Sequence, residues 1–388
     1  MGILGTRGTG NWEPNERPES WREMILYLLP NGDAPLMGLL SRMDPGHATD
    51  PRHSWFEKEL MGREITVAGF DGNTGTITVA SGAKRCPKGT LIMNAATSEV
   101  MRVNADPTID TALVVDRNLA ADNPAPAAPA ANNVLAIFSS SYREGAPTPT
   151  PTGTNPTRRQ TYTHIVRNSL GLTRTALQTS LRTGEGYRNA QIECLQIQSM
   201  EMEMATFLSV GREASEDNQM LREMRGIWQM LNDWAPDNVK NVGNFTEAEY
   251  RDYDKEIFDY GNDPKLAFVG SHGNSQLIRM GEAGGTFNYV YGDEHWGLRI
   301  REFTATGTLK LVKHPLFRHF QTLLDKEMLI LDLPKVKFTP LAGKDMVFIP
   351  HRESNGDDER KDEYLVEFCV ELHHPKAHYR MRNLGNYQ

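Results

Sequence analysis

Apolar residues near the start of the chain recur at helical spacing. The first set occupies positions i, i+3, i+4, i+7 and i+8 and predicts one apolar helix face: Trp21, Met24, Ile25, Leu28 and Leu29. The turn-forming residues 30–32 end this helix, and a second short apolar helix is predicted over 36–40. The apolar faces of this arm exceed what its own residues can cover. We therefore expect the arm to pack on the body of the protein or on a neighbouring chain.

From about residue 62 to 150 the apolar residues alternate with polar ones in short runs. Turn signals such as Asp71-Gly72-Asn73 and Ser81-Gly82 separate the runs, so the region is predicted to form β-hairpins. The stretch from 122 to 156 is rich in proline, which favours a stiff, extended segment that packs poorly: Pro124, Pro126, Pro129, Pro147, Pro149, Pro151 and Pro156. We interpret the whole region as a long β-rich excursion from the main body.

The strongest helical pattern covers residues 185–214. Apolar side chains repeat there every three or four residues, which predicts a helix of about 30 residues covered on more than one side. The alternation of methionine and glutamate over 200–204 indicates a packing seam rather than a cofactor site. Residues 162–175 before this helix are predicted to form a strand.

Helices and strands are predicted to alternate in the remainder. Thr246 to Glu249 forms a capping box that opens a helix, 266–269 reads as a buried strand, and 296–312 reads as a hairpin turning near Gly307. Residues 364–372 alternate as a strand with one buried face. Its partner is predicted at 346–349, across an acidic loop.

Composition excludes several classes of protein. The chain has 388 residues, of which 39% are hydrophobic and 24% charged, so it has enough apolar residues for a globular core. Its net charge of −8 disfavours tight binding of DNA or RNA. No apolar run reaches the length of about 18 to 20 residues that spans a bilayer, and the N-terminus lacks the layout of a signal peptide. We expect the protein to stay in the compartment where it is made, with no membrane partner.

The cysteines and the first residues give weak signals. Cys86, Cys194 and Cys369 are too far apart for a redox or zinc motif, and we interpret them as reduced, structural thiols. Met1-Gly2 opens a formal myristoylation pattern, which we interpret as chance because no basic cluster follows.

No catalytic constellation stands out in the sequence. Walker A, dinucleotide-binding, nucleophile-elbow and His-Glu-x-x-His motifs are missing, and Pro375 breaks the spacing of the group His373, His374 and His378. We interpret that group as a surface cluster at a strand end. His314 and His319 have no acidic or thiol companion at ligand spacing. The alternative function is a cytoplasmic hydrolase whose distributed site joins His272, His314 and Asp325.

Four segments carry a resemblance to a known family: DAPLMGLL at 33–40 with SWF at 54–56, TYTHI through LTRTAL at 161–177, the long helix, and EFCVELHHPKAH at 367–378. Together with the order of the elements, they resemble the major capsid proteins of tailed double-stranded DNA bacteriophages, with the Hong Kong 97-type capsid fold that encapsulin shells also use. The resemblance implies an α+β fold.

The same resemblance implies a division of the chain. Residues 1–60 would be an N-terminal arm, and 61–160 an extended E-loop with a β insert. Residues 161–222 and 336–388 would form a peripheral domain with a spine helix at 185–214, and 223–335 an axial domain. Removal of residues 1–43 is expected to leave a folded subunit that cannot assemble.

The implied function is structural, with no enzymatic activity, cofactor or metal. Pentamers and hexamers would form an icosahedral or prolate shell around phage DNA without binding it tightly, in the virion and, during assembly, in the host cytoplasm. The implied partners are other copies of the chain, a separate scaffolding protein, a portal protein and, as a further candidate, a decoration protein. An encapsulin-like nanocompartment is the alternative shell. Some members of this fold crosslink an E-loop lysine to asparagine, but Lys84 and Lys88 lie in a polar turn, so we expect no crosslink.

Overall fold

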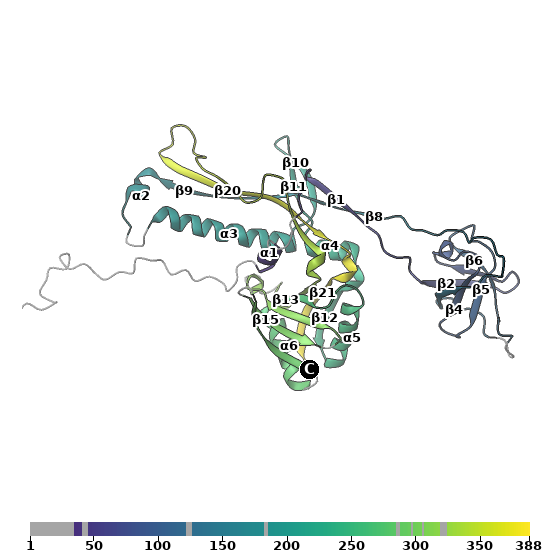
Figure 1. Cartoon of the computed structure of the whole chain (residues 1–388). Helices are drawn as coiled ribbons and strands as arrows, with labels where there is room; N and C mark the ends of the chain where they lie inside the picture. The colour runs from purple at the N-terminus through teal and green to yellow at the C-terminus, as the bar shows by residue number, and fades with distance from the viewer. Residues whose placement is uncertain are drawn as a thin grey trace, which may run out of the picture. The chain divides into compact units, whose positions relative to one another are not determined.

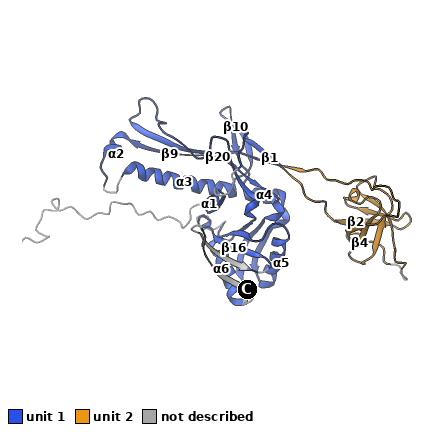
Figure 2. Ribbon diagram, in the orientation of Figure 1, with its two compact units in different colours: residues 1–55, 160–388 blue, residues 56–159 orange. Residues whose placement is uncertain are grey.

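The computed structural model describes residues 35–40, 46–121, 126–181, 185–284, 288–295, 298–304, 306–318 and 324–388 (Figure 1). The predicted arm helix around Trp21 to Leu29 lies outside these residues. The chain divides into two compact units (Figure 2): Met1–Trp55 with Gln160–Gln388, and Phe56–Arg159. Strands β1 (Arg52–Glu57) and β8 (Thr157–Tyr162) pair with each other where the chain enters and leaves the second unit.

The second unit is a closed β-barrel with the strand order β2-β3-β6-β5-β4-β7. Its elements are β2 (Glu64–Asp71), β3 (Thr76–Val79), η2 (Ala83–Arg85), β4 (Thr90–Asn94), β5 (Val100–Val103), β6 (Ala112–Asp116) and β7 (Val134–Ser140). Apolar side chains at every second position fill the interior, among them Ile77, Ile92 and Leu135. The prediction of β-hairpins is confirmed, because the consecutive strands β2 and β3, β4 and β5, and β5 and β6 pair antiparallel. The prediction that 122–156 packs poorly is wrong for β7, whose Leu135 is fully buried.

In the first unit, the long helix α3 packs on a four-stranded sheet. The sheet contains β9 (His164–Thr173), β18 (Val336–Pro340), β19 (Val347–Ile349) and β20 (Glu359–Leu372), and α3 (Gly186–Leu208) lies along β9 and β20 (Figure 1). A short helix, α2 (Arg174–Gln178), follows β9. The predicted pairing of 346–349 with the last long strand is confirmed.

The long helix is shorter than predicted. It has 23 residues and ends before Ser209, whereas we expected it to reach residue 214. The chain instead forms a hairpin of β10 (Arg212–Glu216) and β11 (Gln219–Glu223), which the sequence analysis missed. Asp217 and Asn218 both adopt positive φ angles, 47° and 62°, as a two-residue turn between twisted strands requires. This Asp-Asn pair was the available sequence signal.

Strand β20 is buried on both faces near its end, contrary to the prediction of one buried face. Residues from Val366 to Leu372 are all buried, including Glu367 and Glu371. The charged residues tolerate burial because each has polar partners: Glu367 accepts hydrogen bonds from the Thr163 hydroxyl and the Lys344 ammonium at 2.7 and 2.6 Å.

A seven-stranded sheet with the order β12-β21-β17-β13-β16-β15-β14 forms the rest of the first unit. Its strands are β12 (Val239–Phe245), β13 (Lys265–Val269), β14 (Asn288–His295), β15 (Leu298–Thr304), β16 (Thr308–Lys313), β17 (Met328–Leu331) and β21 (Tyr379–Tyr387). The elements around it are α4 (Ile227–Trp234), η3 (Pro236–Asn238), α5 (Glu247–Phe258), α6 (Ser271–Gly284), η4 (Leu316–Arg318), η5 (Leu333–Lys335) and η6 (Pro375–Ala377).

Three local predictions in this region are confirmed. Thr246 and Glu249 form the capping box of α5, β13 is buried throughout, and β15 and β16 form an antiparallel hairpin. The last strand differs, because β21 pairs with β12 and β17 in this sheet, whereas we assigned 336–388 as a whole to the peripheral domain. Within the described residues, no helix is both long and apolar enough to cross a bilayer.

Candidate functional site

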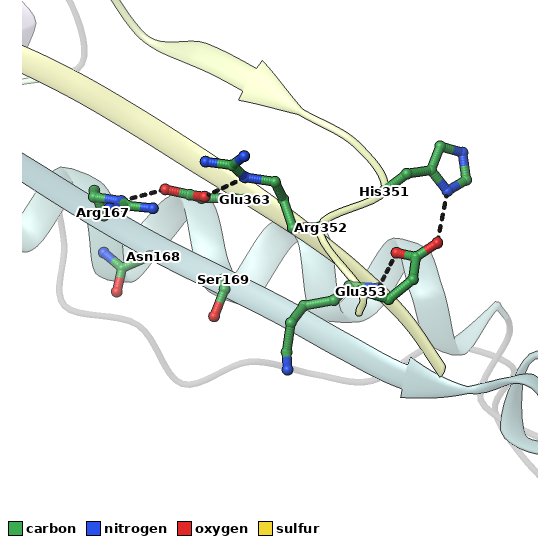
Figure 3. Close-up of a pocket in the computed structure, with 8 residues that line it drawn as sticks. Arg167, Asn168, Ser169, His351, Arg352, Glu353 and Glu363 are labelled. Atoms are coloured by element: carbon green, nitrogen blue, oxygen red, sulfur yellow. Dashed lines mark hydrogen bonds and ion pairs between the residues drawn. The ribbon is translucent and has the colours of Figure 1, made fainter. Parts of the chain in front are cut away.

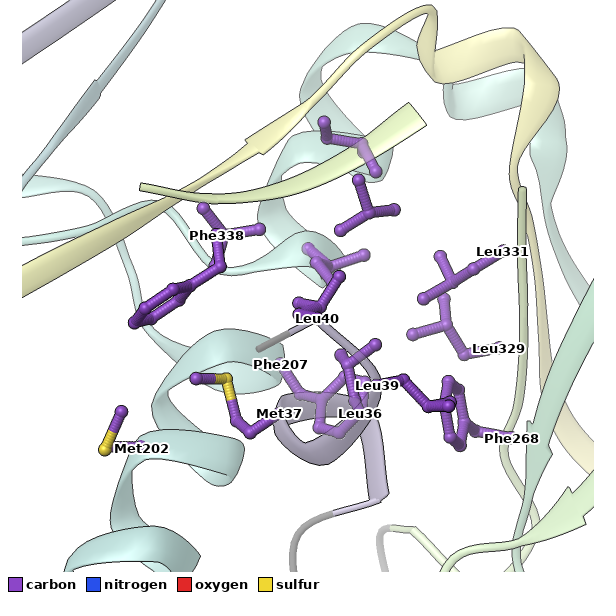
Figure 4. Close-up of a cluster of buried hydrophobic side chains, with 14 of the residues drawn as sticks. Leu36, Met37, Leu39, Leu40, Met202, Phe207, Phe268, Leu329, Leu331 and Phe338 are labelled. Atoms are coloured by element: carbon purple, nitrogen blue, oxygen red, sulfur yellow. The ribbon is translucent and has the colours of Figure 1, made fainter. Parts of the chain in front are cut away.

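The short helix α1 (Pro35–Leu40) is part of the core of the first unit (Figure 4). Leu36 and Leu40 are 0% and 1% exposed, and both belong to the cluster that contains Met202 and Phe207 of α3. The arm prediction left open whether this segment packs on the body or on a neighbour; for residues 35–40 it packs on the body. Removal of 1–43 would therefore take buried side chains out of the core, so the structure favours a destabilised subunit over the intact one that the sequence predicts.

Glu203 of α3 holds the start of α1. Its carboxylate accepts hydrogen bonds from the backbone N–H groups of Leu36 and Met37, at 2.8 and 2.7 Å. These are two of the donors that the first turn of a helix leaves unpaired, and Pro35 contributes none. The Nε2 atom of His314 lies 2.8 Å from the same carboxylate, and both side chains are 0% exposed. One buried carboxylate thus joins α1, α3 and the segment after β16.

A second buried carboxylate, that of Glu371 in β20, contacts strand β1. Glu371 Oε1 lies 2.7 Å from His53 Nε2 of β1 and accepts a hydrogen bond from the Thr339 hydroxyl at 2.9 Å, and its Oε2 lies 2.5 Å from His373 Nε2. Burial opposes ionisation of Glu371, but the hydrogen bonds from His373, His53 and Thr339 outweigh it and hold the pKa of Glu371 well below its usual value.

The imidazole of His378, a member of the predicted surface cluster, forms its hydrogen bonds with the protein backbone. His378 is fully buried, so the surface interpretation is wrong for this residue. Its Nδ1 accepts the backbone N–H of Asp332 at 3.2 Å, and its Nε2 lies 3.1 Å from the carbonyl oxygen of His373. Among the described residues, no group of three or more His, Cys, Asp and Glu side chains is arranged to hold a metal ion.

The contacts of His272, His314 and Asp325 do not form the alternative hydrolase site. Asp325 accepts a hydrogen bond from the backbone N–H of His272 at 3.1 Å, rather than from the imidazole ring. The ring of His314 contacts Glu203 instead. His319 lies outside the described residues. The cysteines are free and buried, and burial raises the pKa of Cys86 to about 11, as expected for structural thiols.

A polar pocket lies beside β9 and β20 (Figure 3). Glu363 in its wall forms ion pairs with Arg167 and Arg352, and the Nδ1 atom of His351 lies 3.1 Å from the Glu353 carboxylate. These charges pair with one another, so the pocket shows a network of ion pairs that connects β20 to its neighbours.

Sequence reasoning missed Glu203 and Glu371 because both occur in amphipathic patterns where a glutamate is expected to face solvent.

The chain has recognisable relatives. The family model described as SU10 major capsid protein matches residues 4–385. A major capsid protein of Pseudomonas phage PaMx41 is 24% identical over 350 residues, covering 88% of this chain and 82% of that protein. Among solved structures, a chain of Microbacterium phage Oxtober96 aligns with 96% of this chain and 97% of its own length, with 9% identity and a TM-score of 0.48. The SrpI encapsulin of Synechococcus elongatus PCC 7942 aligns with 60% of this chain and 78% of its own, with 12% identity and a TM-score of 0.44. On the match to the family model, which spans nearly the whole sequence, this chain belongs to the SU10 major capsid protein family.

Proposed function

We propose that this chain is the repeating subunit of a phage head, in which its pentamers and hexamers tile a closed icosahedral or prolate shell around double-stranded DNA. Family membership carries the proposal: a major capsid protein is a structural protein of the virion capsid and assembles into homo-oligomeric arrays. The family match favours this function over an encapsulin-like compartment, and the contacts of His272, His314 and Asp325 give no support to a hydrolase.

Exposed apolar side chains on α3 support close contact between copies. Ile192 and Ile197 are 37% and 43% exposed, although the sequence predicts a helix covered on more than one side. A stable shell covers such side chains with a neighbour. We propose that the α3 helix is the spine helix, that the barrel unit is the E-loop, and that E-loop strands of a neighbouring copy lie over this part of α3. The seven-stranded sheet, including β21, is our candidate axial domain.

The proposal extends to partners. A separate scaffolding protein is proposed to control the curvature of the shell, and a portal protein to admit the DNA. A decoration protein is a further candidate for the outer surface. The net charge of −8 suits a container that encloses DNA without holding it tightly, and assembly is proposed to take place in the host cytoplasm.

Electron microscopy of the chain expressed alone tests this proposal. We expect assemblies of many copies that lack uniform curvature: tubes, open sheets or shells of mixed size. Uniform closed shells from the chain alone would contradict the need for a separate scaffolding protein. A chain that stays monomeric at high concentration would contradict the shell function itself.

A further inference from the structure

The polar pocket beside β9 and β20 presents cations at its surface and keeps its carboxylates recessed (Figure 3). Its volume is about 480 Å³, and all the residues that line it are polar or charged. The side chains of Arg167, Arg352 and Lys361 are 55%, 48% and 45% exposed. Those of Glu353 and Glu363 are only 20% and 7% exposed. A ligand that enters the pocket therefore meets positive charge first.

One recessed carboxylate is shared by two guanidinium groups. Arg167 of β9 donates through Nε to Glu363 Oε1, and Arg352, in the loop between β19 and β20, donates through Nε to Oε2 at 3.0 Å. The hydrogen bond from Arg167 lowers the pKa of Glu363, so this carboxylate is ionised at neutral pH. Two guanidiniums and one carboxylate leave one positive charge that this group does not neutralise.

The same arrangement leaves hydrogen-bond donors for a ligand. Both ion pairs use the Nε–H group, so the N–H donors on the Nη atoms of Arg167 and Arg352 are not engaged with Glu363. Because both Nε atoms contact one carboxylate, the two guanidiniums are held on either side of it in one wall of the pocket (Figure 3). Ser169 lies directly opposite Glu363 in the strand ladder, which adds a hydroxyl donor to this wall.

The other charges of the pocket have partners of their own. Lys361 Nζ pairs with Glu359 at 2.9 Å. The Glu353 carboxylate accepts the backbone N–H of Lys361 at 3.2 Å and lies 3.1 Å from His351 Nδ1. Figure 3 shows His351 and Glu353 at the opposite end of the pocket from Arg167. The positive charge without a counter-ion therefore lies at the arginine end.

We propose that the arginine end of this pocket binds one phosphate group. The phosphate accepts hydrogen bonds from the Nη atoms of Arg167 and Arg352, while Glu363 holds both side chains in place. A phosphate group has several charged oxygen atoms, which the planar fork of an arginine matches well, so it can bind two such forks at once.

The inference goes beyond the proposed function, because a phosphate site does not require a shell. Two sources can supply the group: free phosphate, and the backbone of enclosed DNA, which as a source rests on the proposed function. A single phosphate contact in each copy agrees with the net charge of −8, which disfavours tight binding of DNA.

Titration of the full-length chain with inorganic phosphate tests the site. Arg167→Gln and Arg352→Gln each remove one fork. Arg174→Gln is the matched control, because Arg174 is 69% exposed and pairs with the exposed Asp358 outside the pocket. Phosphorus NMR at an ionic strength fixed with chloride should show affinity at least tenfold weaker in the two pocket variants and unchanged in the control. Equal affinity in all four proteins, or no phosphate binding by the wild type, would overturn the proposal.

A second measurement uses the wild-type chain and so does not depend on how well a variant folds. Phenylglyoxal modifies accessible guanidinium groups, and mass spectrometry locates the modified residues. Phosphate should slow the modification of Arg167 and Arg352 at least threefold relative to chloride and leave that of Arg174 unchanged. Equal protection of the three arginines would reveal a general salt effect, and this result or the lack of any protection would count against the site.

A short DNA duplex distinguishes the two sources. If DNA occupies the site, the duplex should protect the same two arginines, and loss of the contact in Arg167→Gln should reduce the slope of log affinity against log salt by about 0.9. Protection by phosphate without protection by the duplex would support the site and assign it to free phosphate. A chain that forms shells but binds no phosphate would overturn this inference alone, whereas a chain that binds phosphate but never assembles would contradict the proposed function.

Discussion

The Glu203 carboxylate binds the first backbone N–H groups of α1. Glu203→Gln keeps the shape of the side chain but leaves one oxygen to accept two backbone N–H groups. Hydrogen bonds to a charged group contribute about 1.5 to 3 kcal/mol each. We expect amide exchange in the peptide spanning α1 to accelerate at least tenfold, measured by hydrogen–deuterium exchange.

Glu193→Gln is the matched control for this experiment, because Glu193 lies on the same helix and is exposed. Exchange in α1 should not change in that variant. If Glu203→Gln also left the exchange of α1 unchanged, the carboxylate would not be what holds the arm helix in place.

His378 gives the fold a defined sensitivity to acid. Burial lowers the pKa of His378 to about 3, from a usual value of 6.5. Between these values the unfolded chain binds a proton that the folded chain does not, so stability is complete above pH 6.5 and falls as the pH decreases. The loss is about 2 kcal/mol between pH 6.5 and 5. His164, whose pKa is also lowered by burial, acts in the same direction.

Urea unfolding at pH 7 and pH 5 measures this effect. His378→Gln should be less stable than the wild type at pH 7 but should lose clearly less stability on acidification. An unaltered pH dependence in the variant would show that His378 is already protonated in the folded protein.

The positions of Lys84 and Lys88 disfavour a covalent crosslink between subunits. Their backbone N–H groups bond to Asp110 and Asp106 at 3.1 and 2.7 Å, and both side chains are exposed. An exposed ammonium group remains hydrated and is a poor nucleophile. Particles boiled in detergent and reductant should give one band near 43.6 kDa. A ladder of oligomers that disappears in Lys84→Ala or Lys88→Ala would contradict this expectation.

At the scale of elements, the barrel has its own core and should respond to mutation locally. Ile77 is fully buried in the barrel cluster, which is separate from the clusters of the first unit. Ile77→Ala removes packed atoms and is expected to cost about 2 to 4 kcal/mol. Hydrogen exchange should accelerate in β2 to β7 and not in β13 or β17, and Thr78→Ala should have little effect. Equal acceleration in β13 would show that the two units unfold as one.

The elements that the sequence predicted are those specified by local pattern. The capping box at Thr246, the buried strand 266–269 and the pair of β19 with β20 depend on nearby residues. Barrel closure and the parallel pairing of β21 with β12 join residues far apart in the chain, and no local pattern encodes them. Glu203 belongs with these, because its partners Leu36 and His314 lie more than a hundred residues away.

At the scale of the whole molecule, the chain combines a core that is complete around α1 with surfaces that its own residues leave exposed. The buried Glu203 and Glu371 fix the arm helix and β1 to the first unit, while Ile197 of α3 and Phe138 of the barrel remain accessible. This combination is what a repeating shell subunit requires: stable folding of each copy, with apolar surface reserved for contacts between copies.

A cryo-electron microscopy reconstruction of the assembled particle would show directly whether this chain forms the shell. We expect a closed shell in which this chain forms five-fold and six-fold rings, with α1 of each copy docked on its own α3. A particle in which this chain is missing from the shell lattice, or a chain that forms no assembly larger than a few copies, would contradict it.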